Sequence, residues 1–201
     1  MKIQIKPIEE CAEVIPGFSL KARAEHEPEG SHYIIMAKHV KDTAPFTYNV
    51  KSSDVLRMSI DKDVSKYEVK KGDVLFISRG FRNDAAVIEA IPENTVASST
   101  FYVLRPKSNV ISEYLAWCLN QLNAQGKIDQ IRTGAGTPII QRQLVKEFSI
   151  PLGSLEEQKQ IADLSLLMHK ERHLRKELLQ LTETLHDGLS KKILGGKLHF
   201  K

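Results

Sequence analysis

The strongest constraint in this sequence is a run of leucines in its last quarter, spaced alternately by three and four residues. We call these seven positions the leucine seam, and all but one are leucine: Leu164, Leu167, Glu171, Leu174, Leu178, Leu181 and Leu185. The spacing is the heptad repeat of a coiled coil and is narrower than the apolar stripe of a helix that lies on its own domain. Because each leucine that becomes fully buried contributes about 1.5–3 kcal/mol, we expect a partner helix to cover the seam.

The helix that carries the leucine seam has a start signal and a stop signal. Ser154-Leu155-Glu156-Glu157 matches a capping box, in which the serine hydroxyl accepts from the Glu157 amide and the Glu157 carboxylate accepts from the serine amide. From Leu155 to about Ile193 there is no proline and only one glycine, before Gly195-Gly196 ends the pattern. The sequence therefore predicts a single helix about 57 Å long.

Before about residue 110 the chain has the β-branched, turn-bounded pattern of short strands, which we expect over residues 32–37, 55–60, 73–78, 85–91 and 95–104. A helix is expected from Ser112 to Gly126, and the composition changes near residue 150. These patterns predict an α/β fold. In detail, we expect a mixed α+β domain over residues 1–150 and a long coiled-coil α-helix, a spacer and dimerisation element, in residues 151–201.

The charge and the apolar content of the sequence indicate in which environment the chain folds. The net charge is +4, and residues 31–150 carry sixteen basic and twelve acidic side chains. The longest apolar runs fall far short of the roughly 20 residues of a bilayer span, and the first residues lack the apolar core of a signal peptide. We therefore expect a cytoplasmic protein without membrane contact, in which Cys11 and Cys118 are reduced, buried thiols.

One weak pattern favours an enzyme. Asp61 or Asp63, together with Glu68 and Lys70, matches the acidic and Glu-x-Lys spacing with which magnesium-dependent nucleases hold their metal. A charged strand edge before the turn at Gly72 explains the same residues, and no second acidic pair accompanies them. We keep a small nuclease as an alternative function only.

Other motifs of site chemistry are incomplete. His169 and His173 lie one helical turn apart, but they fall on the outer face of the predicted helix and lack a third ligand. The Gly134-Ala135-Gly136-Thr137 stretch is followed by no Gly-Lys-Ser/Thr, and the sequence contains neither a nucleophile elbow nor a dinucleotide fingerprint. We predict no catalytic residue, no metal ligand and no cofactor in this chain.

The middle of the chain instead carries cationic, amide and hydroxyl side chains on predicted loops. Arginine forks match guanine edges, asparagine matches adenine, and lysine and threonine suit phosphates. We expect residues 79, 82, 83 and 99 at base edges, and residues 38, 41, 132 and 133 at phosphates. The full set of predicted DNA-binding residues is Lys38, His39, Lys41, Arg79, Arg82, Asn83, Ser99, Arg132 and Thr133.

One stretch carries a resemblance to a known family. Ile150-Pro151-Leu152-Gly153-Ser154-Leu155-Glu156-Glu157-Gln158-Lys159-Gln160-Ile161-Ala162 resembles the start of the conserved helix in DNA specificity subunits of type I restriction-modification systems. Residues 33–35, 69–80 and 134–144 follow the order of that family's target recognition domain. The resemblance implies a recognition domain that contacts one half of a split DNA sequence, followed by a helix that acts as a spacer.

The resemblance also implies partners that perform the chemistry. Modification subunits would methylate adenine with S-adenosylmethionine, and a restriction subunit would cut DNA with ATP and Mg²⁺. Two departures limit the comparison. Gly153-Ser154 stands where the family commonly has prolines, and this chain has one recognition domain and one helix where family members usually have two of each.

A half-length chain of this kind suggests a homodimer. Two copies of the leucine seam, about 33 Å long, can pair antiparallel by an isologous contact. The two domains would then lie about one turn of DNA apart. The sequence leaves open which bases are recognised and whether the chain pairs with itself or with a different half-subunit. A protein-interaction module without DNA binding also remains an alternative.

Overall fold

The computed structural model describes residues 3–20, 26–40, 47–49, 55–134 and 136–195. It divides into two compact units, Met1–Asp163 and Leu164–Lys201, and each is described here by itself. Within the described ranges no helix is long and apolar enough to cross a membrane. The strands are β1 (Gln4–Pro7), β2 (Ala12–Pro16), β3 (His32–Ile35), β4 (Thr47–Asn49), β5 (Leu56–Met58), β6 (Val74–Ile77), β7 (Ala85–Ala90), β8 (Thr95–Ala97), β9 (Phe101–Pro106) and β10 (Ser149–Leu152). The helices are α1 (Ile8–Cys11), η1 (Ala37–His39), η3 (Ser65–Tyr67), α2 (Ser112–Leu119), α3 (Leu122–Gln130), α4 (Arg142–Glu147) and α5 (Leu155–Leu194).

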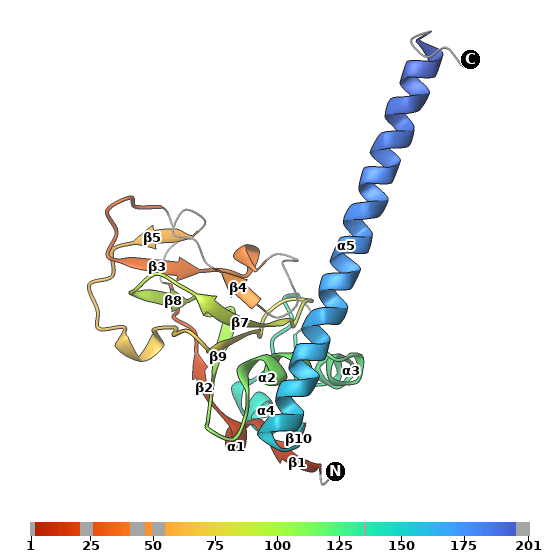
Figure 1. Ribbon diagram of the computed structural model, residues 1–201. Coiled ribbons are helices and arrows are strands. Elements are labelled where there is room, and N and C mark those ends of the chain that lie inside the picture. The colour runs from red at the N-terminus through yellow and green to blue at the C-terminus, as the bar shows by residue number, and fades with distance from the viewer. Residues whose placement is uncertain (1–2, 21–25, 41–46, 50–54, 135, 196–201) are drawn as a thin grey trace. The chain divides into compact units, whose positions relative to one another are not determined.

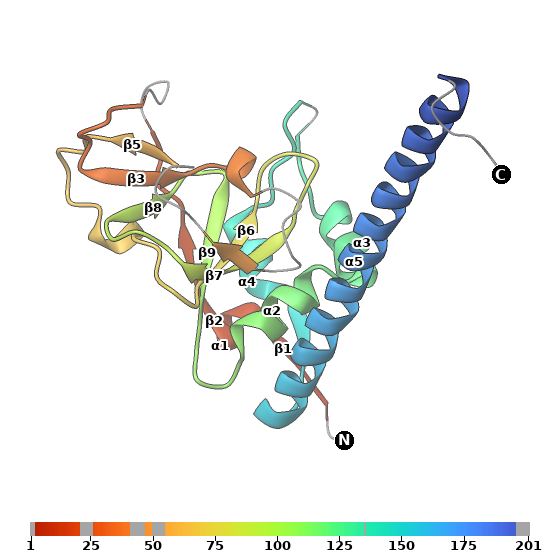
Figure 2. The ribbon, with the colours of Figure 1, turned by 45° about the horizontal axis from the view of Figure 1, so that its top comes forward.

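The centre of the first unit is β6, the middle strand of a five-stranded sheet with the order β2-β9-β6-β7-β4. Figure 1 labels the other four strands of this sheet, and Figure 2 labels β6. All four of its residues are buried. Val74 and Phe76 belong to the apolar cluster that includes α2, whereas Leu75 and Ile77 belong to a second cluster that includes Ile35 of β3. Because successive side chains of a strand point to opposite faces, this continuous apolar run forms a strand that is covered on both sides.

A second sheet has three strands in the order β5-β3-β8. Strand β3 pairs parallel with β8 and antiparallel with β5. The single strand predicted over residues 95–104 is therefore wrong, because this stretch forms β8 in one sheet and β9 in the other. A turn separates them, in which the Phe101 amide donates to the Ser98 carbonyl at 3.0 Å and the hydroxyls of Ser98 and Thr100 lie 2.6 Å apart.

The third sheet consists of β1 and β10 only, which pair antiparallel from Gln4 opposite Leu152 to Pro7 opposite Ser149. The Ile8 amide continues this pairing by donating to the Phe148 carbonyl at 2.9 Å. Since β10 ends just before α5, the pairing fixes the start of the chain beside the start of the long helix. The strand pattern in the sequence did not predict β1.

The helix predicted from Ser112 to Gly126 is interrupted after Leu119, and Gly126 lies inside α3. Asn120 causes the interruption. Its side-chain amide donates to the Ala85 carbonyl at 2.7 Å and accepts from the Ala85 amide at 2.9 Å, which ties this point of the chain to β7. Ser112 is the first residue of α2 rather than its cap, and its hydroxyl donates to the Gly72 carbonyl at 2.7 Å.

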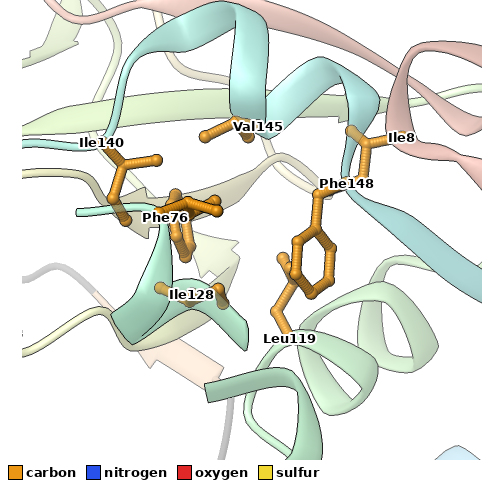
Figure 3. Close-up of a pocket in the computed structure, with 8 residues that line it drawn as sticks. Ile8, Phe76, Leu119, Ile128, Ile140, Val145 and Phe148 are labelled. Atoms are coloured by element: carbon orange, nitrogen blue, oxygen red, sulfur yellow. The ribbon is translucent and has the colours of Figure 1, made fainter. Parts of the chain in front are cut away.

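Helices α2, α3 and α4 enclose a small hollow over one face of β6 (Figure 3). Its lining is entirely apolar and consists of Ile8, Phe76, Leu119, Ile128, Ile131, Ile140, Val145 and Phe148. Such a lining offers no hydrogen-bonding group to a ligand, so we assign the hollow to the core. The same cluster buries Cys11 and Cys118, which are both free thiols as predicted, and burial raises the pKa of Cys118 to about 12.

The capping box at the start of α5 is confirmed. The Glu157 amide donates to the Ser154 hydroxyl at 3.2 Å, and the Ser154 amide donates to the Glu157 carboxylate at 2.8 Å. These contacts hold the pKa of Glu157 below its usual value. The helix runs without interruption from Leu155 to Leu194, which is 40 residues and about 60 Å.

Gln158 fastens the beginning of α5 to the rest of the first unit. Its side chain is 1% exposed and makes three hydrogen bonds. Its oxygen accepts from the Ile111 amide at 2.9 Å, and its nitrogen donates to the carbonyls of Asn109 and Gly153, both at 3.0 Å. The first turns of α5 therefore belong to the first compact unit, which extends to Asp163, whereas the composition changes near residue 150.

Replacing Gln158 by alanine is expected to lower the free energy of unfolding by about 1–3 kcal/mol, because the part-buried Ile111 amide loses its acceptor. Urea unfolding followed by circular dichroism measures the loss. Gln160→Ala is the matched control, since Gln160 is an exposed residue on the same helix and its replacement is expected to change stability little. Equal stability of the two variants would contradict the anchoring role of Gln158.

Candidate nucleic-acid interface

Two of the predicted binding segments follow the ends of the parallel strands β3 and β8. Ile35 of β3 lies opposite Ala97 of β8, and the Ser98 amide donates to the Ile35 carbonyl at 2.8 Å. Helix η1, with the exposed Lys38, follows β3, and the turn with the half-buried Ser99 follows β8. Because parallel strands end at the same edge, these two segments lie at one edge of the three-stranded sheet.

The loop between β6 and β7, residues 78–84, joins the same edge. The Ser78 amide donates to the Thr100 carbonyl at 2.8 Å, and the Ser78 hydroxyl donates to the same carbonyl at 3.0 Å. At the other end of this loop the Ile77 amide donates to the Asp84 carbonyl at 3.0 Å. The loop that carries Arg79 and Arg82 is therefore bonded to the turn that carries Ser99.

A short hairpin at residues 133–139 packs beside the β6–β7 loop. Thr133 and Ile139 exchange backbone hydrogen bonds of 3.0 and 2.8 Å, and Gly134 adopts a φ of +106° that favours glycine. The hairpin bonds to the loop through the Gly80 amide, which donates to the Pro138 carbonyl at 2.8 Å. Figure 2 shows the loop and the hairpin side by side, on the same side of the first unit as η1. We call the described residues of these four segments the loop surface: 37–39, 78–84, 98–100, and 132–134 with 136–139.

The arginines of the loop surface differ in their partners. Arg82 donates from Nε and Nη2 to the Asp84 carboxylate at 2.8 and 2.6 Å. Arg132 pairs with Asp129 at 2.5 Å, and its Nη1 donates to the Phe81 carbonyl at 3.1 Å. Arg79 is exposed, and among the described residues no hydrogen bond or ion pair occupies its guanidinium. Arg79 is thus the arginine best placed to bind an external acceptor.

Asn83 is placed differently from the prediction that it contacts a base edge. Its side chain is 2% exposed, and its nitrogen donates to the Ile77 carbonyl at 2.9 Å, so it braces the base of the β6–β7 loop. Among the described residues its buried oxygen has no hydrogen-bond partner. The sequence motif could not distinguish an exposed asparagine from a buried one in a loop of this composition.

The side chains of two further predicted residues, Lys41 and His39, are outside the described part of the structure. Lys41 lies outside the described residues. The backbone of His39 belongs to η1, but its side chain is outside the described part. The hydroxyl of Thr133 is exposed and donates to the Ile139 carbonyl at 3.2 Å, within the hairpin.

Tyr102 of β9 bonds to the chain just beyond the hairpin. Its hydroxyl donates to the Ile140 carbonyl at 3.0 Å. Burial raises the pKa of Tyr102, and the nearby charges of Arg79 and Arg142 oppose this rise.

Two residues of the nuclease alternative bond to other residues through their backbone. The Glu68 carbonyl accepts from Arg105 at 2.9 Å, and the Lys70 amide donates to Asp73 at 2.7 Å. Asp73 is in turn paired with Arg105. Within the described ranges, no three or more histidine, cysteine or acidic side chains form a group that could hold a metal ion.

The leucine seam occupies the second unit and is exposed along its whole length. Its six leucines are each between 53 and 67% exposed. Glu171, the charged position of the seam, pairs with Arg175 of its own helix at 2.6 Å. Since six large apolar side chains of the seam remain in water, the seam is suited to pack against a second helix.

Sequence reasoning missed one exposed residue of the loop surface. Phe81 stands at the tip of the β6–β7 loop and is 77% exposed. The sequence held a signal for it, because a bulky aromatic residue between Gly80 and Arg82 interrupts a loop of polar and turn-forming residues.

Comparison with known proteins places this chain in a family. Residues 2–168 match the family model of the type I restriction modification DNA specificity domain. The chain therefore belongs to this family.

Particular relatives extend this assignment. The putative type I restriction enzyme MjaX specificity subunit of Methanocaldococcus jannaschii is 32% identical over 108 residues, which cover 51% of this chain and 25% of that protein. Three solved structures share the fold. They are the S subunit of the M. genitalium type I system (15% identity, TM-score 0.57, 96% of this chain), the HsdS subunit of Thermoanaerobacter tengcongensis (17%, 0.63, 98%) and a chain from a study of type I R-M complex assembly and conformational transition (18%, 0.74, 98%). This chain spans 46% of the length of each solved chain.

Replacing Gly80 by alanine is expected to lower the free energy of unfolding by about 1–3 kcal/mol, because Gly80 has a φ of +103° that disfavours a side chain. The Cβ itself would meet no atom within 4 Å, so the cost is conformational. Urea unfolding measures the change. Gly136→Ala is the matched control, since Gly136 lies on the same surface, has equally open space and has no positive φ. An undisturbed Gly80→Ala variant would contradict this account.

Proposed function

We propose that the chain is the sequence-specific DNA-binding subunit of a type I restriction-modification system and that its loop surface contacts one half of a bipartite target. The observation that carries the proposal is the convergence of separate loops on one surface, bonded to one another, in a chain of the DNA specificity family. Loops held by a rigid scaffold are the usual position of recognition residues.

Six residues of the loop surface have a proposed part. Arg79 binds a guanine edge in the major groove, because its guanidinium is exposed and has the fork that matches the O6 and N7 acceptors. Arg82 and Ser99 lie beside it as further base contacts. Lys38, Arg132 and Thr133 contact phosphates, which fix the position of the domain on the duplex.

Partner subunits supply the chemistry in this proposal. Modification subunits bound to the chain would carry S-adenosylmethionine, and a restriction subunit would carry ATP and Mg²⁺. The chain would direct both to the target and would have no catalytic residue of its own. This division follows from the class of the chain, whose relatives are named as specificity subunits.

The proposed assembly is a homodimer through the leucine seam. Two antiparallel copies would cover the leucines of both helices and place the two helix starts at opposite ends of a contact about 33 Å long. One turn of DNA measures about 34–36 Å, so the two loop surfaces would meet successive major grooves. The recognised sequence would be an inverted repeat with an unread spacer. Glu171 would set the register at some cost in stability.

Selection of bound duplexes from a random pool tests the function directly. The full chain is mixed with the modification subunits of its system, and bound duplexes are sequenced. An enriched inverted repeat supports both the recognition and the dimer. A single asymmetric site contradicts the homodimer, and a pool without any enriched sequence contradicts the DNA-binding function.

Arg79→Ala is expected to weaken binding to the selected duplex by about 1–3 kcal/mol and to relax the preference at one base pair, because one guanine contact is lost. Fluorescence anisotropy on the selected duplex and its single-base variants measures both effects. Arg79→Lys retains the charge without the fork, so it is also expected to lose the preference. Lys71→Ala, which removes a charge before the opposite end of β6, is the control. A uniform loss on all sequences would assign Arg79 to a phosphate instead.

Leu178→Lys is expected to convert the dimer into a monomer, because it places a charge on each helix within the apolar contact. Light scattering over a range of concentrations measures the mass. Leu179→Lys is a close control, because the two leucines are 65 and 60% exposed and only Leu178 belongs to the seam. A wild-type chain that is monomeric at all concentrations, or a dimer that survives Leu178→Lys, would contradict the proposed contact.

A further inference from the structure

Phe81 differs in exposure from the other phenylalanines that the structure describes. It is 77% exposed, whereas Phe76 and Phe101 are each 1% exposed. It lies within the loop surface, at the tip of the β6–β7 loop. A single exposed apolar residue is ordinary on a protein surface, so the position of Phe81 on the loop surface, beside Arg132, is what points to an external contact.

The backbone around Phe81 is held on both sides. The Gly80 amide donates to the Pro138 carbonyl at 2.8 Å, and the Phe81 carbonyl accepts from Arg132 at 3.1 Å. The next residue, Arg82, is tied to Asp84. The ring is therefore presented from a braced loop, and little backbone ordering is needed when it contacts a partner.

Arginines lie close to Phe81 along the chain and at its backbone. Arg79 and Arg82 stand two and one positions away in the chain, and Arg132 bonds to the Phe81 carbonyl. The carboxylates of Asp84 and Asp129 are engaged by Arg82 and Arg132, while Arg79 stays exposed. An exposed apolar ring with arginines nearby suits a nucleic-acid duplex, because the duplex has anionic phosphates on its surface and stacked aromatic bases in its interior.

We propose that Phe81 inserts as an apolar wedge between two adjacent base pairs of the recognised half-site and partly unstacks them. The inference rests on the proposed DNA-binding function and adds to it a second kind of recognition. A wedge favours a base step that is easily opened, such as a pyrimidine–purine step. The half-site would thus be selected by its deformability at this step as well as by the base edge that Arg79 binds.

The test uses the duplex recovered in the selection, with 2-aminopurine in place of each adenine of the half-site in turn. The fluorescence of 2-aminopurine rises when the base is unstacked. Wild-type chain is expected to raise it at one step only. Phe81→Ala is expected to abolish the rise and to weaken binding by about tenfold, the size of effect expected when one stacking contact with a base is lost.

Two comparisons make the test specific. Phe81→Ala is expected to leave the salt dependence of binding unchanged, because no phosphate contact is removed, and to leave the urea unfolding midpoint unchanged, because the ring is exposed. Ile5→Ala is the matched control, since Ile5 on β1 is 66% exposed and lies outside the loop surface. It is expected to bind DNA like the wild type.

The outcomes separate the wedge from the function on which it rests. A wild-type chain that binds the selected duplex without any rise in fluorescence overturns the wedge and leaves the DNA-binding function intact, as does a Phe81→Ala variant with unchanged affinity and fluorescence. A Phe81→Ala variant that binds DNA normally but loses the modification subunits assigns the ring to a protein contact and also overturns the wedge. A wild-type chain that selects no sequence overturns both proposals.

Discussion

The burial of β6 on both faces is the constraint on which the loop surface depends. Four consecutive apolar residues place Val74 and Phe76 in one cluster and Leu75 and Ile77 in another, so the strand cannot shift by one residue without exchanging its two sides. The strand ends directly at Ser78, whose amide and hydroxyl both bond to the Thr100 carbonyl. The β6–β7 loop is thereby fixed at its root by the core and at its tip by the hairpin, and its exposed side chains gain a defined position.

A second fixed point lies at the start of α5. The capping box determines which residue begins the helix, and Gln158 determines where that residue is fastened in the first unit. The pairing of β1 with β10 holds the same corner from the other end of the chain. If two copies pair through their long helices as proposed, these contacts at the start of α5 would help to set the distance between the two loop surfaces, because a helix has a fixed rise per residue.

The sequence predicted the elements whose signals are local and missed those that depend on distant contacts. Continuous apolar runs predicted β6 and β7, and the Ser154 capping box predicted the start of α5 to the residue. The break between α2 and α3 depends on Asn120, whose partner Ala85 lies 35 positions away. The burial of Asn83 depends in the same way on how the loop folds back on Ile77, so its composition alone suggested an exposed ligand. The convergence of the loops follows from parallel pairing of β3 with β8, which no local pattern specifies.

Exposed apolar residues need a different explanation from the elements that the sequence did not predict. The leucine seam leaves large apolar side chains in water along one continuous helix, and Phe81 does so from a loop bonded to its neighbours. In sequences that otherwise agree with their fold, such departures are expected at functional or strained sites. The exposed leucines of the seam follow heptad spacing along one helix, a pattern that suits contact with another helix. Phe81 is instead a single exposed ring near arginines, which suits contact with a nucleic-acid duplex.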